Sequence, residues 1–226
     1  MRKRALGSKG RALAVSVLLL SPLPAGAQEL DAGHLQIHVD GRRVGSERFR
    51  VWRAGSTVNA VARIEIVQRP AREVGLQMDP DLLPMQYEVE EGRSVLVSGE
   101  RFADRVRFQF ATAGGEGWKE YMVQEVGAIV EPGVAHHYLL LVRTMRKAPE
   151  GRLEVLLPLA GRSVPARLTG EGPDSVEIGE GSVAATRYDL EVDGAGLSVW
   201  LDADDKLLRV VEPGARREAI RAPVEG

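Results

Sequence analysis

Alternation of apolar and polar residues with a period of two runs through most of the chain and constrains its fold more than any other feature. The alternation is clean over residues 35–40, 57–67, 85–90 and 105–110. Successive side chains of a β-strand point to opposite faces of the sheet, so this pattern is typical of antiparallel strands with one buried and one solvated face. It predicts an all-β protein.

Turn-forming residues separate the alternating segments. Runs rich in Gly and Asp occupy residues 40–45, 91–94, 193–196 and 202–206, and both residue types tolerate the backbone of tight turns. Turn signals every ~8–12 residues favour roughly ten to thirteen strands with little helix. So many strands predict one large curved antiparallel sheet or an open β-barrel, because either arrangement hides sheet edges.

Several segments depart from the alternation. Residues 68–84 contain three prolines and are interpreted as a crossing loop with about one helical turn. Residues 137–142 are apolar on both faces, which predicts a central strand covered on both sides. Residues 148–151 and 170–174 are interpreted as turns, and the tail from about Pro213 as a frayed end.

The amino terminus has the pattern of an export signal. Five basic residues and no acid precede an apolar run over residues 12–20, and Ala25-Gly-Ala27 follows it as a small-residue cleavage site. We expect a signal peptide at 1–27 and a single β domain at 28–226, periplasmic or secreted in a bacterium; the alternative is an uncleaved anchor. No later segment reaches the ~18 apolar residues that a membrane-spanning helix needs.

Charge and cysteine content exclude several classes of function. Without the five basic residues of the leader, 25 Lys and Arg stand against 32 Asp and Glu, a net charge of −7. Such an acidic chain lacks the basic footprint that nucleic-acid binding requires. The absence of cysteine excludes disulfides, thiolate nucleophiles and thiolate zinc sites.

The sequence offers no recognisable catalytic or metal site. His34 and His38 would lie ~13 Å apart on one strand, too far to share a metal, and His136 and His137 would point to opposite faces of theirs. A metal site that joins His38 to His136 or His137 across strands is the alternative. The acidic turn that begins at Asp202 lacks the Gly and Glu of a calcium loop.

No serine triad or phosphate loop is present either, so we expect no enzyme activity and no cofactor. A hydrolase with a dispersed carboxylate site is the remaining catalytic alternative, and it would need carboxylates with strongly shifted pKa values.

Aromatic residues are the remaining candidates for a site, and they are scattered along different predicted strands. Those proposed to line an apolar ligand cavity are Tyr87, Phe108, Phe110, Trp118, Tyr138, Tyr188 and Trp200. The ordinary interpretation is that they fill the core. The functional interpretation is that they surround a pocket inside the curved sheet, as in barrels that hold one ligand.

Two hairpin motifs carry a family resemblance. Residues 41–49 read Gly-Arg-Arg-Val-Gly-Ser-Glu-Arg-Phe, and residues 199–209 read Val-Trp-Leu-Asp-Ala-Asp-Asp-Lys-Leu-Leu-Arg. Both resemble hairpins of exported bacterial domain-of-unknown-function families, although Asp205-Lys206 stands where those families carry Gly. The resemblance implies a curved antiparallel sheet or open barrel, broadly similar to lipoprotein-carrier and lipocalin-like folds. It carries over no functional residue.

Together these features predict an exported, non-enzymatic β-protein that binds or carries an apolar, lipid-like ligand in the cell envelope. The alternative is an interaction or scaffold module of the envelope, with a filled core and no ligand. The two alternatives differ in whether the interior of the sheet is open or filled.

Overall fold

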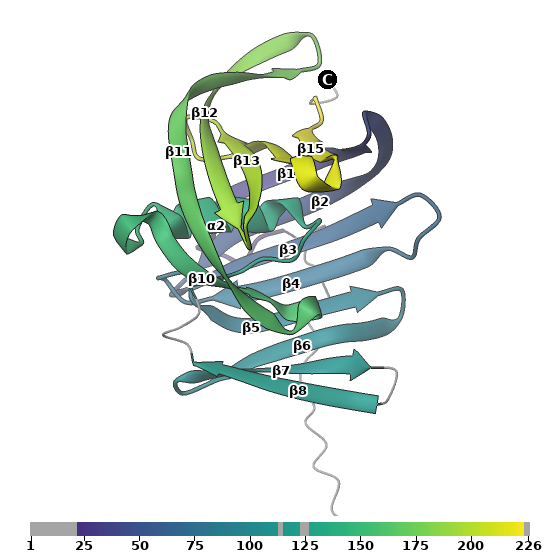
Figure 1. Ribbon diagram of the computed structural model, residues 1–226, viewed down its shortest axis with the longest axis vertical. Helices are drawn as coiled ribbons and strands as arrows, with labels where there is room; N and C mark the ends of the chain where they lie inside the picture. The colour runs from purple at the N-terminus through teal and green to yellow at the C-terminus, as the bar shows by residue number, and fades with distance from the viewer. Residues whose placement is uncertain (1–21, 113–114, 123–126, 224–226) are drawn as a thin grey trace, which may run out of the picture.

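The computed structural model describes residues 22–112, 115–122 and 127–223 (Figure 1). Residues 1–21 of the predicted signal peptide therefore lie outside the described residues. The strands are β1 (Gln28–Val39), β2 (Arg42–Ala54), β3 (Thr57–Ile66), β4 (Arg72–Met78), β5 (Pro84–Glu91), β6 (Ser94–Phe102), β7 (Arg105–Thr112), β8 (Gly115–Met122), β9 (Ala128–Ile129), β10 (Arg152–Leu157), β11 (Arg162–Ile178), β12 (Gly181–Val192), β13 (Ala195–Leu201), β14 (Leu207–Glu212) and β15 (Arg217–Arg221). The helical segments are α2 (Ala135–Met145) and the short 3-10 turns η2 (Pro149–Gly151), η3 (Pro158–Ala160) and η4 (Pro213–Ala215).

All the strands belong to one curved sheet, so the all-β prediction is confirmed. Their order is β8-β7-β6-β5-β4-β3-β2-β1-β15-β14-β13-β12-β11-β10-β9, with antiparallel pairing except between β9 and β10. The count of fifteen strands exceeds the predicted ten to thirteen, because segments interpreted as loops and tail form strands of their own.

The sheet is open along its backbone, since β8 and β9 stand at its two ends and do not pair with each other. A side-chain hydrogen bond connects the two end regions of the sheet instead. Nζ of Lys119 on β8 donates a hydrogen bond of 2.6 Å to the carbonyl oxygen of Gly161, at the turn between β10 and β11. Figure 1 shows β10 and β11 passing across the β3–β5 part of the sheet.

The hairpin turns fall where the sequence predicts them. Asp40-Gly41 and Asp193-Gly194 both have positive φ at each residue, 52° and 75° in the first pair and 53° and 76° in the second. Two consecutive left-handed residues match the twist of two-residue hairpins. Asp205, in the turn between β13 and β14, has a φ of 58°, a conformation that Asp adopts more readily than most residues.

A helix, and not the predicted central strand, contains residues 137–142. α2 lies on the concave side of the sheet, and nine of its residues are buried, including both histidines (Figure 1). An apolar run of six residues is compatible with either element, and residues 135–142 of α2 are buried on every side of the helix because the sheet surrounds it. The prediction that His136 and His137 point to opposite faces of a strand is therefore wrong.

Three further expectations are wrong for related reasons. Residues 68–84 contain β4, because Pro70 and Pro80 lie just outside its ends. Residues 170–174 belong to β11, whose pairing with β12 has a bulge between Leu168 and Gly170. In the described part of the tail, residues 213–223, η4 is followed by β15, which pairs with β1 on one side and β14 on the other.

Removing a core side chain from α2 tests whether the helix fills the interior. Leu141 is 0% exposed, so Leu141→Ala should lower the free energy of unfolding by about 2–5 kcal/mol through lost burial and a residual cavity. Val67→Ala is the control, because Val67 is 68% exposed. Urea unfolding measures both, and equal stabilities of the two variants would contradict a packed helix.

Candidate functional site

A buried carboxylate from β2 caps the N-terminus of α2. Glu47 Oε2 accepts the backbone N–H of Ala135 at 2.8 Å, and Oε1 accepts that of His136 at 2.9 Å. The side chain of Val134, at the N-cap position, makes no capping bond. The first backbone N–H groups of a helix have no partner within it, and together with the helix dipole they favour a negative charge here. A residue distant in sequence therefore supplies the cap that the local sequence lacks.

The same carboxylate holds the ring of His136. Glu47 Oε1 lies 2.9 Å from Nδ1 of His136, and Nδ1 must be the donor because a carboxylate only accepts. Burial alone would raise the pKa of Glu47, but the hydrogen bonds and attraction from His136, with the backbone N–H groups, outweigh it and lower the pKa. Glu47 is therefore a carboxylate in the core.

The first hairpin motif supplies this arrangement. Gly45 lies so close to β3 that a Cβ there would collide with the carbonyl oxygen of Glu65. Phe49, two residues beyond Glu47, stacks on His136 with a centroid distance of 5.9 Å and an interplanar angle of 10°. The spacing Gly-x-Glu-x-Phe thus brings β2 close to β3 at Gly45 and places a carboxylate and an aromatic ring against the start of α2.

A second buried carboxylate, Glu131, precedes the helix. Its backbone N–H donates to Nδ1 of His137 at 3.0 Å, and its Oε2 accepts the N–H of Leu159 at 3.0 Å. Burial raises the pKa of Glu131 to about 7, although Leu159 and Arg72 act in the opposite direction. Burial, and then the proximity of His136, hold the pKa of His137 well below its usual value.

These four groups are closed to solvent, and Glu47, His136 and His137 are each 0% exposed. The geometry fixes the start of α2 within the sheet. In the described part of the chain, no three His, Cys, Asp or Glu side chains gather where they could hold a metal ion.

The seven aromatic candidates do not lie together. Tyr87 and Phe108 are buried on the concave face and contact each other edge to face at 6.2 Å. Tyr138 of α2 and Tyr188 of β12 are buried in the same core, and Phe110 packs against it.

The two tryptophans of that set lie elsewhere. Trp118 is 67% exposed. Trp200 belongs to a separate cluster with Val176 and Leu208, and its Nε1 donates to Asp174 at 2.8 Å. Six members of the set therefore lie in two packed clusters, and Trp118 lies at the surface.

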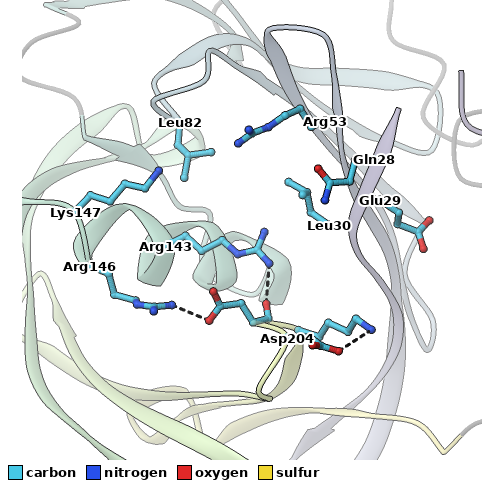
Figure 2. Close-up of a pocket in the computed structure, with 11 residues that line it drawn as sticks. Gln28, Glu29, Leu30, Arg53, Leu82, Arg143, Arg146, Lys147 and Asp204 are labelled. Carbon is cyan, nitrogen blue, oxygen red and sulfur yellow. Dashed lines mark hydrogen bonds and ion pairs between the residues drawn. The ribbon is translucent and has the colours of Figure 1, made fainter. Parts of the chain in front are cut away.

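A cavity of about 630 Å³ opens beside the C-terminal end of α2, and we call it the rim cavity. It lies between the start of β1, the end of β2, the β4–β5 loop, the end of α2 and the β13–β14 turn (Figure 2). Its lining residues are Gln28, Glu29, Leu30, Arg53, Leu82, Arg143, Arg146, Lys147, Asp204, Asp205 and Lys206. None of the seven aromatic candidates is among them.

Cations outnumber acids around the rim cavity, five to three. Figure 2 shows Arg53, Arg143 and Lys147 reaching toward one open space from three sides. A second hollow of about 640 Å³, over β10–β12, differs because its charged groups pair locally, as Arg167 does with Glu191 at 2.8 Å. The rim cavity is the stronger candidate for a binding site.

Sequence reasoning missed the rim cavity. Arg53 lies at the end of β2, and Arg143 and Lys147 lie in and just after a helix that the sequence pattern does not predict. No local spacing relates Arg53 to the other two. Burial of residues 137–142 on all sides concealed the helical period, which was the one signal that could have placed Arg143 and Lys147 near each other.

Removing the Glu47 carboxylate should destabilise the folded protein. Glu47→Ala leaves two backbone N–H groups and a histidine ring without their acceptor, so we expect a loss of about 3–5 kcal/mol in the free energy of unfolding. Glu65→Ala is the control, because Glu65 makes an exposed ion pair with Arg63 worth about 0–1 kcal/mol. Urea unfolding compares them, and similar losses for both variants would refute the capping role.

Glu131 should make stability depend on pH. Its pKa is about 7 in the folded protein against 4.5 in the reference state, so the folded protein binds a proton more readily and gains stability as pH falls from 7 to 4.5. Glu131→Gln removes this dependence. Urea unfolding measures the difference in free energy of unfolding between the wild type and Glu131→Gln. This difference should favour the wild type more at pH 5 than at pH 8. Parallel pH profiles would contradict the shift.

Comparisons with known proteins are sparse. No protein-family model matches the chain, and no curated protein matches it in sequence. Among solved structures, a crystal structure of a β-barrel-like protein of domain of unknown function DUF1849 from Brucella abortus is similar. The alignment covers 86% of this chain and 95% of that chain, with 10% sequence identity and a TM-score of 0.46.

Proposed function

We propose that this chain is a non-enzymatic binding protein that holds a small ligand in the rim cavity. The observation that carries the proposal is a cavity of about 630 Å³ toward which Arg53 and Lys147 extend, with no ion pair to another described residue. Cavities of about 300–1,000 Å³ with apolar walls and a few polar groups are typical of small-molecule sites. Leu30 and Leu82 supply apolar wall here.

The packing of α2 moves the proposed ligand site away from the interior of the sheet. An apolar ligand among Tyr87, Phe108 and Tyr138 would have to displace a helix whose buried residues pack into one continuous core. The rim cavity needs no such displacement, because it already opens at the end of that helix. We therefore keep the proposal of ligand binding and place the proposed site in the rim cavity.

The proposed setting is the cell envelope, since the leader predicted at residues 1–27 directs export. Among the described residues no helix is long and apolar enough to cross a membrane. An exported binding protein of this kind would meet its ligand in the periplasm or outside the cell.

A second candidate function is that of an interaction module, and the outer face of β6–β8 favours it. Phe102 and Trp118 are 53% and 67% exposed, and Arg107 lies over both rings at 5.8 Å and 5.6 Å. Trp118 lies on the edge strand β8 and Phe102 at the end of β6, two strands away, and exposed aromatic groups at a sheet edge are typical of contact surfaces.

Native mass spectrometry of residues 28–226 from an envelope fraction tests the ligand-binding function. We expect a co-purifying mass that is lost under organic denaturation and is absent from Leu30→Trp, which fills the cavity. Val67→Trp is the matched control, because it adds the same side chain at an exposed position, and it should retain the mass. A clean apo mass for the wild type would refute the proposal and favour the interaction module.

A further inference from the structure

The acidic residues of the rim cavity are already neutralised. Asp205 Oδ1 pairs with Arg146 at 2.7 Å, and Asp204 pairs with Lys206 at 3.6 Å. Glu29 pairs with Arg50, outside the lining, at 2.9 Å. Within the described part of the chain, three of the five lining cations therefore make no ion pair with a carboxylate: Arg53, Arg143 and Lys147.

A rigid turn orients Arg143. Asp202 Oδ1 accepts the backbone N–H groups of Asp204 and Lys206, each at 2.9 Å, and so fixes the β13–β14 turn. The turn presents the carbonyl oxygen of Asp205 to Nη2 of Arg143 at 2.7 Å. This contact is with a carbonyl oxygen, so it positions the guanidinium; the carboxylates of Asp205 and Asp31 attract the guanidinium without a direct ion pair, and burial outweighs them and lowers the pKa of Arg143. Partial burial of that charge makes an anionic partner favourable.

One wall of the cavity is apolar. Leu82 is 6% exposed, and Leu30 packs against the main core. Both lie beside the open space that the three cations surround (Figure 2). A fully hydrated ion such as free phosphate would leave this wall without a partner, whereas a molecule with an apolar portion would cover it.

We infer that the rim cavity binds an amphiphilic anion, whose carboxylate or phosphate head lies among Arg53, Arg143 and Lys147 and whose apolar part lies against Leu30 and Leu82. This inference rests on the proposed function and adds the chemical class of the ligand. A carboxylate and a phosphate accept hydrogen bonds from these groups in the same way.

Isothermal titration calorimetry with five probes tests the inference: dodecanoate, dodecyl phosphate, dodecanol, dodecyltrimethylammonium and inorganic phosphate. We expect both anionic amphiphiles to bind, dodecanol to bind at least about tenfold more weakly, and the cation and inorganic phosphate not to bind measurably. The affinity for the anions should fall as salt is raised, because the head contributes through charge. The stronger of the two anionic probes identifies the preferred head.

Variants locate the binding. Arg53→Gln and Lys147→Gln should each weaken dodecanoate binding by about tenfold or more, with no change for dodecanol. Arg69→Gln is the control, because Arg69 is exposed and lies outside the rim cavity; it should bind as the wild type does. Thermal unfolding of each variant verifies that it is folded.

Each contrary result has a distinct meaning. Equal affinity for dodecanol and dodecanoate, blocked by Leu30→Trp, would overturn the anionic head and leave the proposed function standing. Inorganic phosphate that binds as tightly as dodecyl phosphate would overturn the amphiphilic character. Failure of every probe to bind, or unchanged binding by Arg53→Gln and Lys147→Gln, would overturn the inference as a whole.

Discussion

The hydrogen bonds from Glu47 to the start of α2 are the interaction on which the rest of the structure depends. The helix has no side-chain cap of its own, and its buried N-terminus would otherwise leave unpaired N–H groups in an apolar interior. Once Glu47 of β2 satisfies them, a helix that is buried on all sides over residues 135–142 can lie within the curved sheet. The core then forms around the helix, and the interior needs no ligand to fill it.

The position of α2 also creates the rim cavity. Its first turn is held at the buried cluster around Glu47, whereas its last turn and the two residues after the helix carry Arg143, Arg146 and Lys147 to the rim. The β13–β14 turn meets this end, and its Asp205 contacts two of the three basic residues. One element therefore fills the core at one end and supplies most of the positive charge of the candidate site at the other.

The sequence determines the strands more plainly than the helix or the site. Alternation and left-handed turn residues predict the all-β class and the hairpins at Asp40-Gly41 and Asp193-Gly194, because both signals are local. β4 and β15 were missed because nearby prolines suggested loops, although each proline lies just outside its strand. α2 was missed because complete burial removes helical periodicity. The rim cavity depends on contacts between distant elements, which local patterns do not encode.

Amide hydrogen exchange of residues 135–145, followed by mass spectrometry, tests most directly the claim that a capped and buried α2 is the core of this fold. A helix held in this way can exchange only through global unfolding, so its amides should be protected to the same degree as those of the central strands β1 and β2. Exchange of α2 well before β1 and β2 would contradict the claim, because it would show a helix that opens independently of the sheet.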